Sequence, residues 1–186
     1  MYWWVSHDFI QYTGPVAFGE VMTSRDYFPP GFTPTNSQLK LGFIESVRQR
    51  ADFSNLDDSL FFVNGRALHA FRDLFISSGR VFEIAQPEGL DHYLILIDRV
   101  FDAFDWQSSE YEAAGSPPNI MHGISRIRRV VLKEGFRTTF DIFRLGHFFP
   151  LLGVLIVSDR LKKIYEDNHF TGLCFAPAEI GVLPEA

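Results

Sequence analysis

Only one cysteine occurs among the 186 residues, which excludes an intramolecular disulfide and suits a reducing compartment. The first residues, MYWWVSHDF, lack the basic segment and the long apolar segment of a secretory signal peptide. The most apolar run, residues 148–157, is far shorter than the about 20 residues of a membrane-spanning helix, and Pro150 and Gly153 interrupt it. We therefore predict a soluble, cytoplasmic protein.

Charged residues are also few, at 22% of the chain, and they give a net charge of −6. A nucleic-acid-binding protein needs clustered Lys and Arg for the phosphates, so this balance argues against one and is compatible with a basic protein partner. Apolar residues make up 46% of the chain, and Phe alone occurs 20 times. This supply is enough for a sizeable core. We expect a single domain over residues 1–186, or two intimate lobes over about 1–112 and 119–186.

The motifs of common catalytic and binding sites are missing. The six histidines include no pair at helical i, i+4 spacing, and none forms a metal-ligand pattern with the cysteine. The sequence contains neither a G-x-S-x-G nucleophile elbow nor a glycine-rich phosphate-binding loop. We expect Cys174 to be a small apolar side chain buried in a strand. We therefore predict no catalytic residue, no metal site and no cofactor, and a protein that is not an enzyme.

The clearest local pattern lies in residues 154–178, where a strand, a helix and a second strand are predicted. An apolar β-branched run comes first, Ser158 can cap the helix, and Gly172 suits the break after it. The same pattern begins at residue 60, with Asn64 in the place of Ser158. The two segments match at further positions, with a one-residue gap after the arginines: Arg66 with Arg160, Leu68 with Leu161, Phe71 with Ile164, Gly79 with Gly172, and Phe82 with Phe175. The matches indicate one strand–helix–strand unit that occurs twice.

The N-terminal third of the chain gives weaker predictions. Residues 1–12 suit a first strand, in which the adjacent Trp3 and Trp4 would face opposite sides. Residues 39–47 suit a strand or a short helix. The polar residues 52–59 suit a loop that leads into the first unit.

A turn at residues 133–136 lies between two β-prone runs, residues 125–132 and 137–145. This arrangement predicts a β-hairpin. Together with the two units, it predicts a sheet-rich α+β (mixed α/β) fold with about two main helices.

Two groups of charged residues are candidates for a binding surface. An acidic group suits a partner-binding surface that steers a basic partner, and it consists of Asp98, Asp102, Asp105, Glu110 and Glu112. A basic group suits a nucleic-acid or phosphate site, and it consists of Arg126, Arg128, Arg129, Lys133 and Arg137. The alternative for each group is a solvated surface, with the basic side chains paired to nearby acids.

Several short segments resemble a known family. The C-terminal ones are Ile142-Phe143-Arg144-Leu145, Val157-Ser158-Asp159-Arg160-Leu161 and Thr171-Gly172-Leu173-Cys174-Phe175. Two other segments also match. One is Tyr93-Leu94-Ile95-Leu96, followed by Val100-Phe101-Asp102-Ala103-Phe104-Asp105 and by Ser108 or Ser109 with Glu110. The other is residues 64–68, which have Asn and Gly where Ser and a charged residue are usual. Over roughly residues 52–180 the sequence resembles the bacterial immunity proteins of polymorphic-toxin systems, in the group numbered eleven.

The resemblance implies a cytoplasmic protein that binds and blocks a cognate toxin, often one delivered by a contact-dependent or type VI secretion route. The shared motifs look like determinants of the fold, so no active site is carried over. The leading hypothesis is an immunity protein that neutralises its toxin by stoichiometric protein–protein interaction. One alternative is a small hydrolase or toxin-modifying enzyme whose site is assembled from distant residues. A second is a nucleic-acid-binding regulator that uses the basic group.

Overall fold

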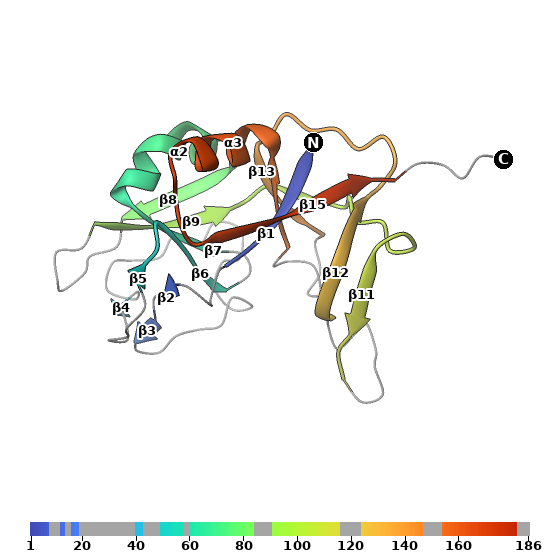
Figure 1. Cartoon of the computed structure of the whole chain (residues 1–186), viewed down its shortest axis with the longest axis horizontal. Helices are drawn as coiled ribbons and strands as arrows, with labels where there is room; N and C mark the ends of the chain where they lie inside the picture. Colours follow the sequence, from blue (N-terminus) through green and yellow to red (C-terminus); the bar gives the residue numbers. More distant parts are fainter. Residues whose placement is uncertain are drawn as a thin grey trace.

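The computed structural model describes residues 1–7, 12–13, 16–18, 40–42, 49–57, 60–83, 91–115, 124–146 and 154–181. Two helices and two main sheets make up this part of the chain (Figure 1). The helices are α2 (Gly65–Ser78) and α3 (Asp159–Asp167). The strands of the smaller main sheet are β6 (Phe53–Asp57), β7 (Leu60–Asn64), β8 (Gly79–Glu83) and β9 (His92–Ile97).

The larger sheet has seven strands and spans the sequence from its first residues to its last described ones. Its strands are β1 (Tyr2–His7), β10 (Val100–Phe101), β11 (Glu110–Ala113), β12 (Ile124–Leu132), β13 (Ile142–Leu145), β14 (Leu155–Ser158) and β15 (Leu173–Ile180). Two small sheets pair β2 (Tyr12–Thr13) with β5 (Gln49–Arg50) and β3 (Val16–Phe18) with β4 (Lys40–Gly42). The prediction of a sheet-rich α+β fold is confirmed.

The strand–helix–strand unit occurs twice, as predicted, and each copy contains two further strands. The smaller sheet has the order β6-β7-β9-β8, and the larger one has the order β10-β13-β14-β1-β15-β12-β11. We call β6, β7, α2, β8 and β9 the first unit, and β13, β14, α3, β15 and β1 the second unit. In both units an antiparallel strand pair comes directly before the helix. The strand that precedes the helix in the sequence and the strand that follows it are not neighbours in the sheet, because a middle strand lies between them. That middle strand is β9 in the first unit and β1 in the second.

The predicted one-residue gap between the units is wrong. Asn64 and Ser158 are the N-caps, and each accepts a hydrogen bond from the backbone N–H three residues later. Counted from the cap, the third and seventh residues are buried in both helices: Ala67 and Phe71 in α2, Leu161 and Tyr165 in α3. The strand after the helix begins at the same distance from the cap, with Gly79 in one unit and Leu173 in the other. Apolar residues at i+3 and at i+4 both fit one face of a helix, so the sequence pattern does not distinguish the gapless alignment from one with a gap.

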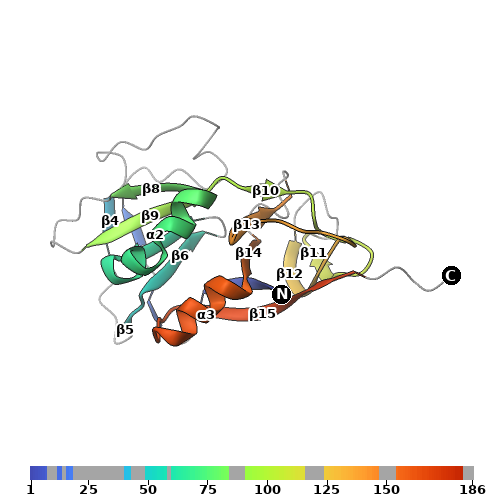
Figure 2. The same cartoon turned by 90° about the horizontal axis from the view of Figure 1, so that it is seen from above.

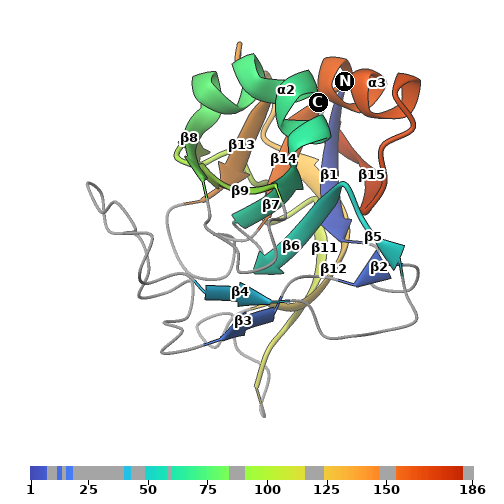
Figure 3. The ribbon, with the colours of Figure 1, turned by 90° about the vertical axis from the view of Figure 1, so that its left-hand side faces the viewer.

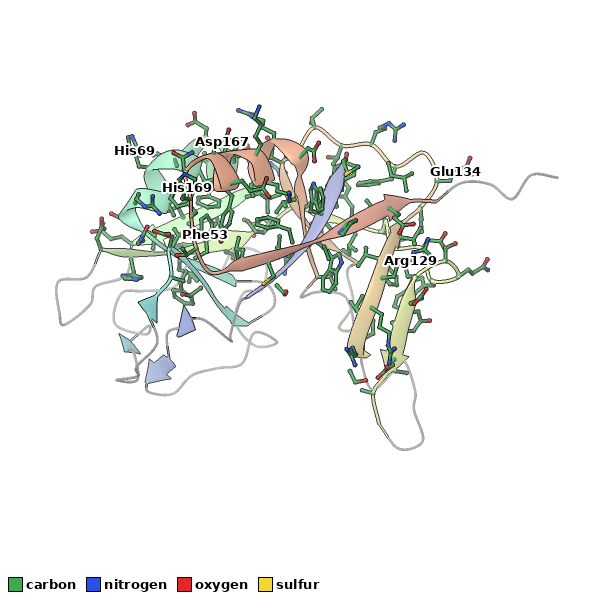
Figure 4. The ribbon with its side chains drawn as sticks, viewed as in Figure 1. Phe53, His69, Arg129, Glu134, Asp167 and His169 are labelled. Atoms are coloured by element: carbon green, nitrogen blue, oxygen red, sulfur yellow. The ribbon has the colours of Figure 1, made fainter. Side chains whose placement is uncertain are left out.

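Both units contribute to one core beneath the helices. Phe53 of β6 is 1% exposed and contacts the rings of Phe71 in α2 and Tyr165 in α3 at centroid distances of 5.3 and 5.5 Å. Figure 3 shows α2 and α3 side by side above the sheets, and Figure 4 shows Phe53 below them. Fully burying one such ring contributes roughly 1.5–3 kcal/mol, so the shared aromatic core joins the two units.

A second core lies on the other face of the larger sheet. It includes Phe104, Phe143 and Ile156, which are fully buried. Trp3 packs against the first core and Trp4 against the second, because successive strand residues face opposite sides. The prediction for this tryptophan pair is confirmed.

Three further predictions are wrong. Residues 52–59 were expected to form a loop, but β6 covers most of them, because β6 pairs with β7 and Phe53 packs into the shared core. The predicted hairpin forms strands at 124–132 and 142–145 that do not pair with each other; β12 pairs with β11 and β15, and β13 pairs with β10 and β14. Cys174 is in a strand as expected, but its side chain is exposed, because it points away from the core that Leu173 and Phe175 contact.

The organisation as one domain or two lobes stays a prediction. Of the helices in the described ranges, neither combines the length and the apolar character needed to cross a membrane.

Candidate partner-binding surface

A two-stranded arm carries half of the ten charged residues that the sequence analysis singled out. Within the described part of the chain, residues 130–132 of β12 pair with β15, whereas residues 124–129 pair only with β11. We call β11 and residues 124–129 the arm. Figure 1 shows it projecting from the body of the molecule. The arm therefore presents side chains that the rest of the sheet does not cover.

Buried contacts hold the base of the arm. The hydroxyl of Ser109 donates to the carbonyl of Val131 at 3.2 Å and accepts from its N–H at 2.9 Å. The rings of Phe104, Trp106 and Tyr111 contact one another, with Phe104 and Trp106 at a centroid distance of 4.8 Å. These contacts fix the segment before β11 against β12, so they hold the arm in a defined orientation at its base.

The acidic and basic groups pair with each other along the arm. Arg128 binds Glu112, and Arg129 binds Glu179 of β15 at 2.5 Å and approaches Glu110 at 3.9 Å. These hydrogen bonds raise the pKa of Arg129 and lower the pKa of Glu179. The pairs are exposed and screened by water, so they contribute little to stability. They place acidic and basic side chains next to each other, so positive and negative charges alternate along the arm.

Asp102 and Asp105 lie at the base of the arm. Asp102 accepts a hydrogen bond from Lys133 at 2.8 Å. Asp105 accepts from the N–H groups of Gln107 and Ser108 at 3.0 and 3.1 Å. Hydrogen bonds from the side chain and backbone of Ser108 are the main cause of the lowered pKa of Asp105. The carboxylate of Asp105 thus stabilises the turn that leads into β11.

Asp98 is separate from the other four acids. It follows β9 and pairs with Arg80 of β8 through two hydrogen bonds, at 2.7 and 3.1 Å. In the basic group, Arg126 lies opposite Glu112 in the strand register, and Arg137 donates to the carbonyl of Phe136 at 3.0 Å. The structure therefore brings four of the five predicted acids to one surface, together with most of the predicted bases.

Each unit also contains an aspartate that the sequence analysis did not single out. In the first unit, Asp52 precedes β6 and its carboxylate accepts five hydrogen bonds, from Asn64, twice from Arg66, and from the N–H and the hydroxyl of Thr171. Arg66 also donates to the carbonyls of Asn168 and His169 after α3. This cluster connects the two units. Burial raises the pKa of Asp52, but the hydrogen bonds from Arg66, Asn64 and Thr171 outweigh burial and lower it overall.

In the second unit, Asp141 occupies the position of Asp52. It precedes β13 and accepts hydrogen bonds from Ser158 at 2.5 Å and Arg160 at 3.1 Å. The aspartates precede their caps by 12 and 17 residues, because the loops between the paired strands differ in length. An aspartate directly before the first strand of each unit is the signal in the sequence that could have identified both.

No group of three or more His, Cys, Asp or Glu residues suited to holding a metal ion occurs among the residues that the structure describes.

Comparison with protein-family models identifies the family of the chain. The model of the Imm11 immunity protein family matches residues 31–180, which include nearly all of both units and the whole arm. The match places the chain in the class of immunity proteins. The chain belongs to the Imm11 family. None of the curated proteins compared with the chain matches it.

Proposed function

We propose that this protein binds a cognate bacterial toxin in the cytoplasm and neutralises it as a stoichiometric complex, without catalysis. The observation that carries the proposal is the match of the Imm11 family over residues 31–180. A stable inhibitory complex needs a preformed surface, because ordering a loop on binding reduces affinity. The buried base of the arm provides such a surface.

The arm is the contact surface in this proposal. Glu110 and Glu112 on the arm and Asp102 and Asp105 at its base are the acidic contacts, and the neighbouring arginines set the pattern of charge. A toxin surface of opposite pattern gains specificity and a faster association rate from these exposed charges. A toxin with clustered Lys or Arg would meet the acids of β11 and of the turn before it.

Co-expression tests the function. The chain is expressed with the toxin candidate encoded next to this gene, and growth and co-purification are scored together. Growth rescue with a stable complex is expected. Rescue without a complex would contradict stoichiometric neutralisation and support an enzyme that acts on the toxin, its target or its product.

A charge swap tests the arm. Glu112→Arg alone breaks the pair with Arg128, whereas Glu112→Arg combined with Arg128→Glu restores a pair of reversed polarity. If the arm contacts the toxin, both variants slow association at low salt, although only the double variant keeps the pair. Unchanged association kinetics in the double variant would remove the arm from the interface.

A further inference from the structure

The equivalent aspartates of the two units differ in the number of hydrogen bonds that their carboxylates accept. Asp52 accepts five, and two of them come from Thr171, which belongs to the other unit. Asp141 accepts two in the described part of the chain, from Ser158 and Arg160 of its own unit. A carboxylate offers about four acceptor positions. Asp141 therefore has acceptor capacity that Asp52 has already used.

A hollow of about 440 Å³ lies beside Asp141. Arg160, whose side chain is 68% exposed, also lines it, as do Met1 and Tyr2 at the start of β1 and Ile180 at the end of β15. Residues 137–140, Ser158 and Asp159 complete its wall. The hollow is thus bordered by two carboxylates, two guanidiniums, hydroxyl groups and apolar side chains.

The strand order explains why the hollow occurs in this unit. β15 and β1 run antiparallel, with Ala178 opposite Tyr2, just as Glu83 of β8 lies opposite Tyr93 of β9. Residues 84–91 join β8 directly to β9, whereas β1 precedes the rest of the chain and has no such connection to β15. The hollow lies at the end of the sheet where that connection would be.

The first unit shows what chemistry satisfies an aspartate–arginine pair of this kind. There, the carbonyls of Asn168 and His169 accept from Arg66 at 3.1 and 3.4 Å. The N–H and hydroxyl of Thr171 donate to Asp52 at 3.0 and 2.8 Å. Between them, the ring of Phe170 lies under the guanidinium of Arg66, 4.3 Å from its central carbon. The occupant is a turn that supplies two carbonyl acceptors, an aromatic ring and a threonine.

We propose that a loop of the cognate toxin enters the hollow and completes the second site in the same way. Its main-chain carbonyls accept from Arg160, and a Ser or Thr hydroxyl with a main-chain N–H donates to Asp141. This proposal rests on the proposed function and identifies the kind of toxin segment that is bound. The hollow lies near the arm in the fold, because Ile180 lines the hollow and the neighbouring Glu179 binds Arg129 of the arm.

The test measures the affinity of the purified chain for the purified toxin candidate encoded next to this gene, by titration calorimetry. Arg160→Ala removes the exposed donor, and Thr139→Trp fills the hollow from its exposed wall. Lys163→Ala is the matched control, because Lys163 is an exposed cation on the same helix that does not line the hollow. Thermal melts establish that each variant is folded, and Thr139→Trp decides the outcome if Arg160→Ala is not.

We expect the dissociation constant to rise at least tenfold in Arg160→Ala and in Thr139→Trp, as for a central interface contact, and to stay within twofold in Lys163→Ala. Parent-like affinity in both hollow variants would overturn the inference and leave the proposed function standing. An equal loss in Lys163→Ala would also overturn it, because general charge would then explain the effect. No binding by the parent chain would overturn the proposed function itself.

Discussion

Asp52 and Asp141 hold equivalent positions but should differ greatly in their effect on stability. The perturbation is Asp52→Ala, compared with Asp141→Ala in the same chain. Asp52→Ala removes the acceptor of five hydrogen bonds and leaves donors of Thr171 and Asn64 unsatisfied between the two units. Asp141→Ala removes the acceptor of two, within one unit.

The magnitude follows from the burial of each partner. Removing one partner of a buried ion pair costs about 3–5 kcal/mol. The side chain of Asp52 is 9% exposed, but that of Arg66 is 54% exposed, so water can solvate the arginine once its partner is lost. We therefore place the loss of unfolding free energy for Asp52→Ala at the lower end, about 3 kcal/mol. For Asp141→Ala we expect about 1 kcal/mol, because Arg160 is 68% exposed and Ser158 still caps α3.

Urea denaturation followed by circular dichroism measures both values in the same buffer at pH 7. The Asp52→Ala midpoint should fall clearly further than the Asp141→Ala midpoint, with similar slopes. Equal losses would refute the reasoning, because they would show that the contacts of Asp52 with the other unit add nothing to those it makes within its own.

Two further predictions use the same assay. The stability difference between the parent and Asp52→Ala should shrink as pH falls below about 4. The pKa of Asp52 is lowered in the folded state, so on acidification Asp52 is protonated first in the unfolded chain, and this favours unfolding. A difference that grows on acidification would contradict this. Gly172→Ala should cost about 3 kcal/mol or more, because a Cβ there would lie 1.9 Å from the carbonyl oxygen of Phe53 and φ is +105°. The matched Gly135→Ala, with φ of +68° and nothing within 4 Å of the new Cβ, should cost only about 1 kcal/mol; similar losses in the two would show that crowding at Gly172 is unimportant.

The sequence predicts the helices and their caps well because these signals are local. Asn64 and Ser158 each stand directly after an apolar run and before a helical pattern, so the units could be found without knowledge of their partners. The gapless match could not be found in this way, because apolar residues at i+3 and i+4 both fit one face of a helix.

Strand pairing was predicted less well because it depends on distant residues. A glycine turn between two β-prone runs favours a hairpin, but residues 130–132 instead pair with β15, which is distant in the sequence. The polar residues around Phe53 favoured a loop, whereas pairing with β7 and the burial of Phe53 make residues 53–57 a strand. Asp52 and Asp141 each stand directly before the first strand of a unit, but the prediction of a loop at residues 52–59 left no strand there with which to compare them.

The position of β1 has a consequence for how the chain folds and how it can be rearranged. Residues 2–7 pair with residues 155–158 and 173–178, so the larger sheet cannot close until nearly the whole described chain has been synthesised. Such long-range pairing slows folding, because the entropy of a long loop must be lost before the contact forms. A circular permutant in which residues 2–7 follow residue 180 would replace this closure with a local turn between Ala178 and Tyr2. Both units would then share one strand order, and we expect this chain to fold faster than the natural one.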